Sequence, residues 1–445
     1  MKTKIGFISL GCSKNLVDTE MMLGLLREAG YEMTDSLEEA DMIIVNTCTF
    51  IEAAKEESVN SILEAAEYKK TGHCRRLIVA GCLSQQFQKQ LADEIPEIDI
   101  LVGTNSWQHI IETIRKSEKG GQVLCFEDAP CMNTEHMPRM VTTPGYTSYL
   151  KIAEGCSNGC TFCYIPYVRG PMRSRSIASV AKEAGQLADR GVKELNVIAQ
   201  DSSCYGRDLK DGTTLAGLLS HLVRIEGIHW IRLFYLYPTY FTDELLDLIC
   251  HEKKICKYVD IPLQHISNGV LRRMNRKDTK ESILTLLRKI RKAPVKMTIR
   301  TTLMVGFPGE TEEEFQELCD FIKEIRFDDL GVFMYSPQEG TPAAVMEGQI
   351  PEDVKQARYH EIMSIQAKIS EENDQDCIGQ TAEALVEEIM EEENGKMLAK
   401  GRTSFQAPEV DGNVYIENPG ALKPGDFTTV RITDGYAYDL IAEKI

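Results

Sequence analysis

The sequence predicts an α/β protein of three units: a doubly wound parallel sheet, a partial TIM-like (β/α)6 barrel and a small antiparallel β-barrel. Three observations predict this fold class. The 445 residues are too many for one hydrophobic core. Continuous apolar runs alternate with amphipathic helical segments through most of the chain, as in parallel sheets covered by helices. Short runs separated by Asx-Gly and Pro-Gly turns occupy its end. We place the units at residues 1–130, 142–372 and 375–445.

The first unit repeats the pattern of a strand followed by a helix. Apolar runs predict strands, and the amphipathic segments after them predict helices. The expected strands span 4–10, 41–47, 76–81 and 98–102, and the helices 18–29, 53–68 and 85–94.

Three cysteines of this unit each lie just past the end of a predicted strand: Cys12, Cys48 and Cys82. Ligands bind at the carboxyl edge of open α/β sheets, and neighbouring strands lie about 5 Å apart. Three thiols can therefore converge on one ligand, and an iron-sulfur cluster with one open iron suits them. The alternative is that each is a small strand-end hydrophobe. Cys74, Cys125 and Cys131 lack this placement, so we expect them to be structural.

A segment without periodicity, 126–143, is expected to link the first unit to the second. Six apolar runs alternating with helical segments follow, which indicates a barrel with its active site at the carboxyl ends of the strands. The expected strands span 148–153, 194–199, 230–237, 258–263, 296–305 and 331–335, and the helices 177–190, 215–225, 243–251, 280–292 and 312–325.

The loop after the first barrel strand carries Cys156, Cys160 and Cys163 in the spacing CxxxCxxC. Three thiolates in so short a loop suit one face of a 4Fe-4S cubane and leave its fourth iron open to a small molecule. The alternative is structural zinc, which usually needs a fourth Cys or His nearby. The next cysteine is Cys204, and no histidine lies between.

Polar residues follow other barrel strands and are expected at the same mouth. They include Gln200 with Asp201, and Gln264 with His265. His265 is expected to be structural, because a lone histidine indicates no role. For Arg300, a carboxylate partner from a cofactor or the protein and a purely structural ion pair are equally expected. The turn Gly-Phe-Pro-Gly-Glu at 306–310 leads into a helix whose N-terminus could bind a carboxylate or a sugar.

A charged helix at 351–373 leads to the last unit, whose predicted strands span 380–388, 397–403, 412–416 and 427–433. Small barrels often bind nucleic acid. From Gln375 onward, however, there are six basic and fourteen acidic side chains, the reverse of an RNA-binding surface.

Composition narrows the class of protein. With 50 basic and 68 acidic side chains the net charge is −18, which repels a phosphate backbone and favours a basic protein partner. No signal peptide and no apolar stretch long enough to span a bilayer are evident, so we expect a cytoplasmic protein that does not associate with a membrane. The fourteen cysteines then indicate metal binding or catalysis more than disulfides.

The strand-end cysteines, the CxxxCxxC loop and a C-terminal TRAM-like module together resemble the methylthiotransferase family of radical S-adenosylmethionine enzymes. The runs Ser-Leu-Gly-Cys-Ser-Lys-Asn at 9–15 and Ile-Pro-Leu-Gln-His at 261–265 are similar to the branch that modifies an aspartate of small-subunit ribosomal protein twelve. The tRNA-modifying branch is the alternative. One departure is Tyr164 and Tyr167, where related enzymes often have aliphatic or small residues.

The resemblance implies two 4Fe-4S clusters, one on each cysteine triad, and S-adenosylmethionine, with Gln200 and Arg300 as candidate contacts. It implies that a deoxyadenosyl radical takes hydrogen from the aspartate β-carbon, that the auxiliary cluster delivers sulfur, and that a second S-adenosylmethionine supplies the methyl group. An electron donor such as flavodoxin or ferredoxin is implied. The acidic last unit would dock the basic ribosomal protein, and tRNA is not an expected partner.

Overall fold

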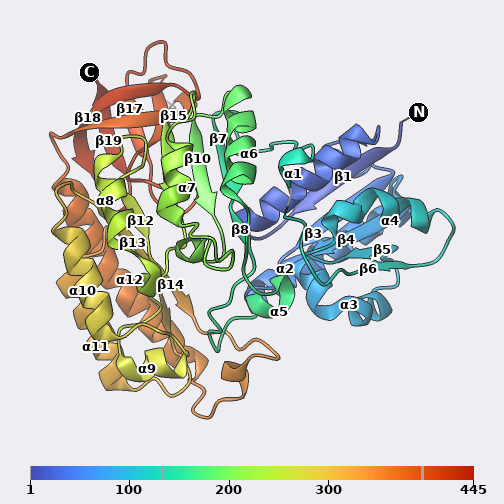
Figure 1. Cartoon of the computed structure of the whole chain (residues 1–445), viewed down its shortest axis with the longest axis horizontal. Helices are drawn as coiled ribbons and strands as arrows, with labels where there is room; N and C mark the ends of the chain where they lie inside the picture. Colours follow the sequence, from blue (N-terminus) through green and yellow to red (C-terminus); the bar gives the residue numbers. More distant parts are fainter. Residues whose placement is uncertain (1, 133, 392–394) are drawn as a thin grey trace.

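The computed structural model describes residues 2–132, 134–391 and 395–445. Its N-terminal part is a six-stranded parallel sheet in the order β2-β1-β3-β4-β5-β6, with helices on both faces (Figure 1). Its elements are β1 (Lys4–Ser9), α1 (Ser13–Glu28), β2 (Glu32–Met33), β3 (Met42–Thr47), α2 (Glu52–Thr71), β4 (Arg76–Gly81), α3 (Cys82–Glu94), β5 (Ile100–Val102), η1 (Trp107–His109), α4 (Ile110–Ser117) and β6 (Val123–Cys125).

Two separate cores cover the two faces of this sheet. Ile43 and Val45 pack with α2 and α3 on one face, whereas Met42 and Ile44 pack with α1 and α4 on the other. Successive strand residues point to opposite faces, so a strand buried on both faces must be apolar throughout. The doubly wound sheet is confirmed. The edge strand β6 was not predicted, because it has three residues and none is fully buried.

The central part is an open barrel made of two three-stranded parallel sheets, β7-β10-β11 and β12-β13-β14. The bridge between Ile231 and Ile255 connects the halves. The elements are β7 (Thr147–Lys151), β8 (Ala153–Glu154), α5 (Ile165–Arg169), β9 (Arg173–Ser174), α6 (Ile177–Asp189), β10 (Glu194–Ile198), η3 (Ser202–Cys204), α7 (Leu215–Leu222), β11 (Trp230–Leu233), η4 (Pro238–Tyr240), α8 (Asp243–His251), β12 (Tyr258–Asp260), α9 (Asn268–Arg273), α10 (Lys280–Arg291), β13 (Thr298–Val305), α11 (Glu312–Ile325), β14 (Asp329–Met334), η5 (Pro342–Val345) and α12 (Glu352–Gln375).

The last part is a closed five-stranded barrel in the order β15-β16-β17-β19-β18. Its strands are β15 (Thr381–Glu391), β16 (Met397–Thr403), β17 (Val414–Glu417), β18 (Phe427–Gly435) and β19 (Leu440–Lys444). Four pairings are antiparallel and one, between β17 and β19, is parallel, so the predicted small antiparallel barrel is confirmed with one parallel pair. Strand direction cannot alternate completely around a closed ring of five, so at least one pair must be parallel.

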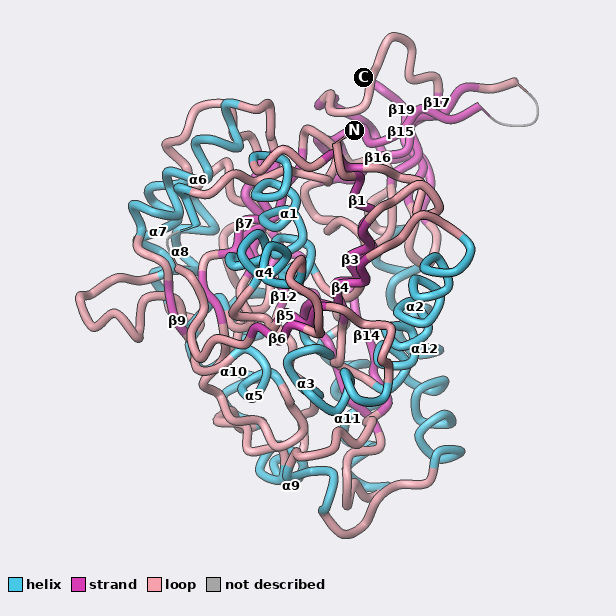
Figure 2. The backbone as a smooth tube through the Cα atoms, turned by 90° about the vertical axis from the view of Figure 1, so that its right-hand side faces the viewer, coloured by secondary structure: helices cyan, strands magenta, loops and turns pink. Residues whose placement is uncertain are grey.

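The C-terminal barrel packs on the amino ends of the central strands. Arg402 pairs with Glu194, the first residue of β10, at 2.7 Å, and the ring of Phe427 lies 4.8 Å from that of Trp230, the first residue of β11. Figure 2 shows this barrel at the opposite end of the molecule from α5 and α9. The carboxyl ends of the central strands are therefore left open to the N-terminal part.

The segment between the first two parts contains η2 (Thr134–His136) but no long element in its described part, as expected of a linker; its Asn133 lies outside the described residues. It is nevertheless anchored. The buried Arg139 pairs with Glu20 of α1 at 2.6 Å and with Glu183 of α6 at 2.7 Å, which fixes one part against the other. In the described part of the chain, every helix is too short or too polar to cross a membrane.

Candidate active site

The CxxxCxxC loop is held in a tight, largely backbone-bonded conformation. Gly155 has φ +77, and a Cβ there would lie 2.4 Å from the carbonyl oxygen of Pro171, so only glycine fits. The Cys156 amide donates to Gly170 O at 3.1 Å and the Thr161 amide to Met274 O at 3.1 Å. The loop is therefore fixed between the start of β9 and the end of α9.

The three thiols of this loop lie close together. Burial raises the pKa of Cys163 to about 12, and the charges of Cys160 and Cys156 add to the rise. Burial likewise raises the pKa of Cys156 to about 11, with Cys160 among the causes. These mutual effects show that the three thiols are near one another.

The N-terminal triad also converges, although its members are far apart in sequence. Cys12 precedes α1, Cys48 follows β3, and Cys82 begins α3 directly after β4. Burial raises the pKa of Cys82 to about 12, and Cys12 and Cys48 add to it. A Cβ at Gly11 would lie 2.8 Å from the Cβ of Cys48, so the first strand end approaches the second closely.

Cys12 differs from the other five cysteines of the triads, because its pKa lies below the ordinary value. Burial alone would raise this pKa, but the cations of Lys14 and Arg169 and backbone amides at the start of α1 outweigh it. Its thiolate is the form that ligates a metal.

The donor set of each triad fits a cluster better than a single ion. Among the described residues, no three Cys, His, Asp or Glu side chains are gathered tightly enough to ligate one metal ion. A cubane of four irons commonly takes thiolates as its protein ligands. Each triad offers three thiols.

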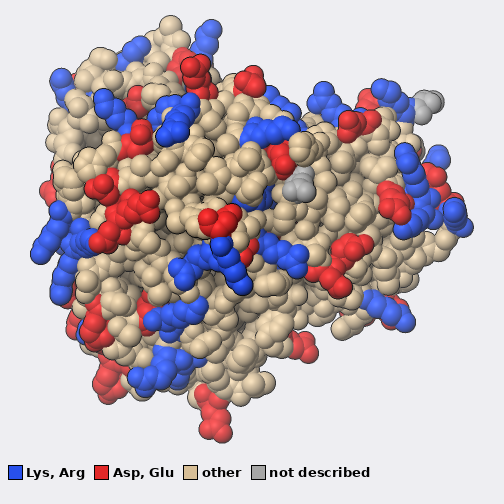
Figure 3. All heavy atoms as spheres, in the orientation of Figure 1, with Lys and Arg blue, Asp and Glu red and all other residues tan. Residues whose placement is uncertain are grey.

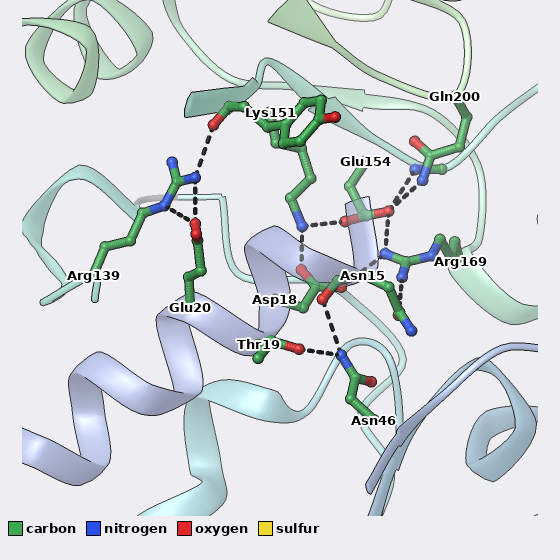
Figure 4. A network of polar contacts seen from close by, with 12 residues as sticks. Asn15, Asp18, Thr19, Glu20, Asn46, Arg139, Lys151, Glu154, Arg169 and Gln200 are labelled. Atoms are coloured by element: carbon green, nitrogen blue, oxygen red, sulfur yellow. Dashed lines mark hydrogen bonds and ion pairs between the residues drawn. The ribbon is translucent and has the colours of Figure 1, made fainter. Parts of the chain in front are cut away.

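A buried network of charges lies between α1 of the N-terminal part and the start of the central barrel (Figure 4). Lys151, the last residue of β7, pairs with Asp18 of α1, and also with Glu154 at 2.7 Å. Arg169, the last residue of α5, pairs with Asp18 at 3.0 Å and with Glu154 at 2.9 Å. All four side chains are less than a tenth exposed, and two positive charges balance two negative ones.

Arg169 extends this network to the thiols. Its Nη2 donates to Asn15 Oδ1 at 2.9 Å. Its cation helps to lower the pKa of Cys12 and opposes the rise in the pKa of Cys82. Because α5 begins two residues after Cys163 and ends at Arg169, this short helix spans the space between the triads. The sequence analysis missed Arg169. The only available signal was a cation six residues after Cys163.

Gln200 follows β10, and its side chain is directed toward Glu154. Its Nε2 donates to Glu154 Oε1 at 2.6 Å, while its buried Oε1 has no hydrogen-bond partner among the described residues. Next to it, Asp201 accepts from Asn158 of the cysteine loop at 2.6 Å. A buried acceptor without a partner is costly, so Gln200 Oε1 is suited to receive a donor from a bound molecule.

Arg300 does not join the mouth. It lies near the amino end of β13, where its guanidinium pairs with Asp260 at 3.2 Å and with Asp411 of the C-terminal barrel at 3.1 Å. These carboxylates already satisfy its charge, so we withdraw Arg300 as a candidate contact to S-adenosylmethionine and assign it to the junction between the two barrels.

His265 lies after β12 in the interior of the central barrel. It is fully buried, burial lowers its pKa to about 3, and its Nδ1 accepts from the Ser267 amide at 3.0 Å, so the ring is neutral. Gln264 and Tyr235 adopt positive φ values of 70° and 60° just past strand ends, which is the kind of backbone strain found at functional sites. The ammonium group of Lys14 lies 3.3 Å from the centre of the Tyr235 ring, which brings α1 to the barrel mouth.

Three family models match the chain: the uncharacterized protein family UPF0004 over residues 4–103, the Radical SAM superfamily over 150–322 and the TRAM domain over 378–445. A relative from Pelobacter propionicus is 51% identical over 443 residues, covering 99% of this chain and 98% of the relative. One from Clostridioides difficile is 48% identical over 442 residues, covering 99% of each. Both are named ribosomal protein uS12 methylthiotransferase RimO.

This chain belongs to the RimO family. Members of that family are radical S-adenosylmethionine methylthiotransferases, and this chain is such an enzyme. Membership of the radical SAM superfamily implies a 4Fe-4S cluster and S-adenosylmethionine as cofactors.

Solved structures agree on the fold. The radical S-adenosylmethionine methyltransferase TsrM from Kitasatospora setae has a TM-score of 0.57 at 16% identity, covering 78% of this chain and 77% of that one. The cobalamin-dependent radical enzyme OxsB has a TM-score of 0.53 at 14% identity, covering 82% of this chain and 56% of that one. The RimO family assignment therefore rests on sequence similarity, whereas the assignment of the barrel fold rests on both sequence and structural similarity.

Proposed function

We propose that this enzyme adds a methylthio group to the β-carbon of an aspartate of ribosomal protein uS12. The observation that carries the proposal is the pair of thiol triads, one at the edge of the N-terminal sheet and one at the barrel mouth, joined by α5 and Arg169. Near-complete alignment with RimO relatives at 48–51% identity supports uS12 as the substrate. A ribosomal protein substrate also places the reaction in the cytoplasm.

In this proposal Cys156, Cys160 and Cys163 hold one 4Fe-4S cluster, and Cys12, Cys48 and Cys82 hold a second. When bound, the clusters and S-adenosylmethionine supply the radical, the sulfur and the methyl group. Three protein ligands at each site leave one iron for a small molecule. A small electron-transfer protein such as flavodoxin or ferredoxin would supply the reducing electron.

In this proposal the chain's own residues bind and orient S-adenosylmethionine, and they exclude water from the site. Gln200 Oε1 would accept a hydrogen bond from the amino group of S-adenosylmethionine, while Glu154 fixes the amide through its Nε2. Lys151, Asp18 and Arg169 close the contact between α1 and the barrel without an uncompensated charge, so solvent does not enter from that side.

We retain the proposed units 1–130, 142–372 and 375–445, with the last as an acidic docking module for the basic substrate. On the face in Figure 3, acidic and basic side chains are interspersed, so the negative charge is not one patch there. Replacing Glu391, Glu392 and Glu393 by Lys should slow association with the substrate at low ionic strength. Glu391 ends β15, and Glu392 and Glu393 lie outside the described residues. Since the module caps the amino ends of the strands, it would bind parts of the substrate away from the target aspartate.

Mass spectrometry tests the proposal directly. Anaerobically reconstituted enzyme with S-adenosylmethionine and a reductant is incubated with uS12 and, separately, with tRNA. We expect a methylthio group on the aspartate of uS12 and no modification of tRNA. Modified tRNA with unmodified uS12 would replace this function by the tRNA alternative. Absence of 5′-deoxyadenosine would indicate an iron-sulfur protein without radical activity.

A further inference from the structure

An exposed aromatic and acidic surface borders the gap between the triads. We define the α5 rim as Tyr164, Tyr167, Glu339 and Val345. Tyr167 is 58% exposed, whereas the next two residues of α5, Val168 and Arg169, are buried against the N-terminal part. Figure 1 shows α5 between the barrel and the N-terminal sheet. A macromolecule that approaches the CxxxCxxC loop over α5 therefore contacts the exposed ring of Tyr167.

The rim is a rigid structure. The rings of Tyr164 and Tyr167 lie 5.0 Å apart. Beneath them, the ring of Phe162 packs edge-on against that of Phe307 at 6.4 Å. The loop at 336–348 is tied to the cysteine loop, because the Ala343 amide donates to Thr161 O at 3.0 Å. Rigid aromatic side chains give binding area at low cost in conformational entropy.

The charge of the rim is negative. The loop at 336–348 contains Glu339 and Glu347 and no Lys or Arg. Both glutamates are exposed, and within the described ranges neither forms an ion pair. Glu339 is close enough to Tyr164 to raise its pKa, after the larger effect of burial. Val345, at 85% exposure, adds apolar surface beside them.

We propose that the α5 rim binds a Lys- or Arg-bearing segment that flanks the target aspartate of the protein substrate. Cations bind over tyrosine faces and beside carboxylates, whereas a nucleic acid backbone would be repelled by Glu339 and Glu347. The rim also repels the target carboxylate itself, which leaves that side chain free to enter between the triads while its basic neighbours are held. This inference rests on the proposed function and names the surface that selects its substrate.

Two rim variants and one matched control test the inference. Tyr167→Ser removes the exposed ring, and Glu339→Lys reverses the charge. Leu63→Ser is the control, since Leu63 is 47% exposed and lies on α2 of the N-terminal part, outside the rim and the C-terminal barrel. Reconstituted full-length proteins are compared for iron content, for Kd of uS12 at low and high salt, and for KM and kcat separately.

We expect each rim variant to weaken uS12 binding about tenfold at low salt and to raise KM, with iron content and kcat unchanged. Glu339→Lys should lose most of its effect at high salt. The control should match the wild type. Unchanged Kd in both rim variants, or a lowered kcat with unchanged KM, would overturn the inference.

The same assay separates the two proposals. If wild-type enzyme methylthiolates uS12 and the rim variants bind it normally, only the rim assignment fails. If wild-type enzyme neither binds nor modifies uS12, the proposed function fails, and the rim assignment fails with it. Weaker binding of RNA, but not of uS12, by Tyr167→Ser would show that the ring stacks on bases and would also overturn the inference.

Discussion

The two thiol triads are built in different ways. Cys156, Cys160 and Cys163 lie within eight residues, so one loop sets their geometry. Cys12, Cys48 and Cys82 meet only because β1, β3 and β4 are parallel neighbours whose strand ends lie in register, with Ser9 opposite Asn46 and Thr47 opposite Gly81. A local triad depends on its loop alone, whereas a distributed triad depends on the whole sheet.

The largest expected effect is the loss of iron from one triad while the other triad keeps its iron. Replacing Cys12, Cys48 and Cys82 by Ala, or Cys156, Cys160 and Cys163 by Ala, should each remove about half the iron of reconstituted protein, because each triad would hold one cluster. Iron and sulfide analysis measures this. The buried Cys250 and Cys319 provide control substitutions that should leave the iron content unchanged. Loss of all iron from either triple variant would mean that the triads share one cluster.

The next effect concerns the link between the triads. Arg169→Met leaves Asp18 and Glu154 with Lys151 as their only cation, and one uncompensated buried carboxylate should cost about 3–5 kcal/mol of unfolding free energy. Urea denaturation measures this. Arg288→Met is the control, since the pair Arg288–Glu324 is more than half exposed and should contribute less than about 1 kcal/mol. If both variants lost the same unfolding free energy, the buried network would not stabilise the contact between the N-terminal part and the central barrel.

A smaller effect tests the close approach of strand ends in the distributed triad. Gly11→Ala introduces a Cβ at φ +88 and 2.8 Å from Cys48, and should cost about 1–3 kcal/mol and lower iron binding by the N-terminal triad. Gly30→Ala has a similar φ of +91 but no atom within 4 Å, so it isolates the backbone strain. Iron content that falls equally in both variants would contradict a specific contact at Gly11.

The smallest expected effect is a pH dependence of stability at the junction with the C-terminal barrel. Unlike the charge-balanced junction between α1 and the central barrel, this junction contains carboxyl groups close to one another. Burial raises the pKa of Asp374 to about 7, and the like charges of Asp328 and Asp439 add to it. Between about pH 4 and 7 the folded carboxyl keeps its proton while the unfolded one has lost it. Unfolding free energy should therefore fall as pH rises through this window.

Asp374→Asn should remove about 1–2 kcal/mol of this pH dependence and raise stability at pH 8. Thermal unfolding between pH 4 and 8 measures it. The exposed Asp376 on the same turn gives the control Asp376→Asn, which should leave the profile unchanged. A profile that Asp374→Asn does not alter would place the titrating group elsewhere.

Sequence patterns predicted elements well where the signal is local. The strand at 76–81 and the helices at 243–251 and 312–325 have the predicted bounds, because periodic apolar residues and side-chain caps such as Thr242 and Thr311 define them. The helix α1 begins at Ser13, five residues before the prediction. No side chain caps its start and its buried residues run through polar positions, so apolar periodicity gave no signal there.

The sequence by itself determined the three-part architecture, the compact cysteine loop and the placement of three other cysteines at strand ends, since each depends on residues close together in the chain or on the repeat of strand and helix. Only the tertiary structure decided that Arg300 pairs with Asp260 and Asp411, that Arg169 connects the triads, and that β17 runs parallel to β19. The physical reason is that a buried charge is settled by whichever element packs against it, and a spacing pattern carries no record of which distant element that is.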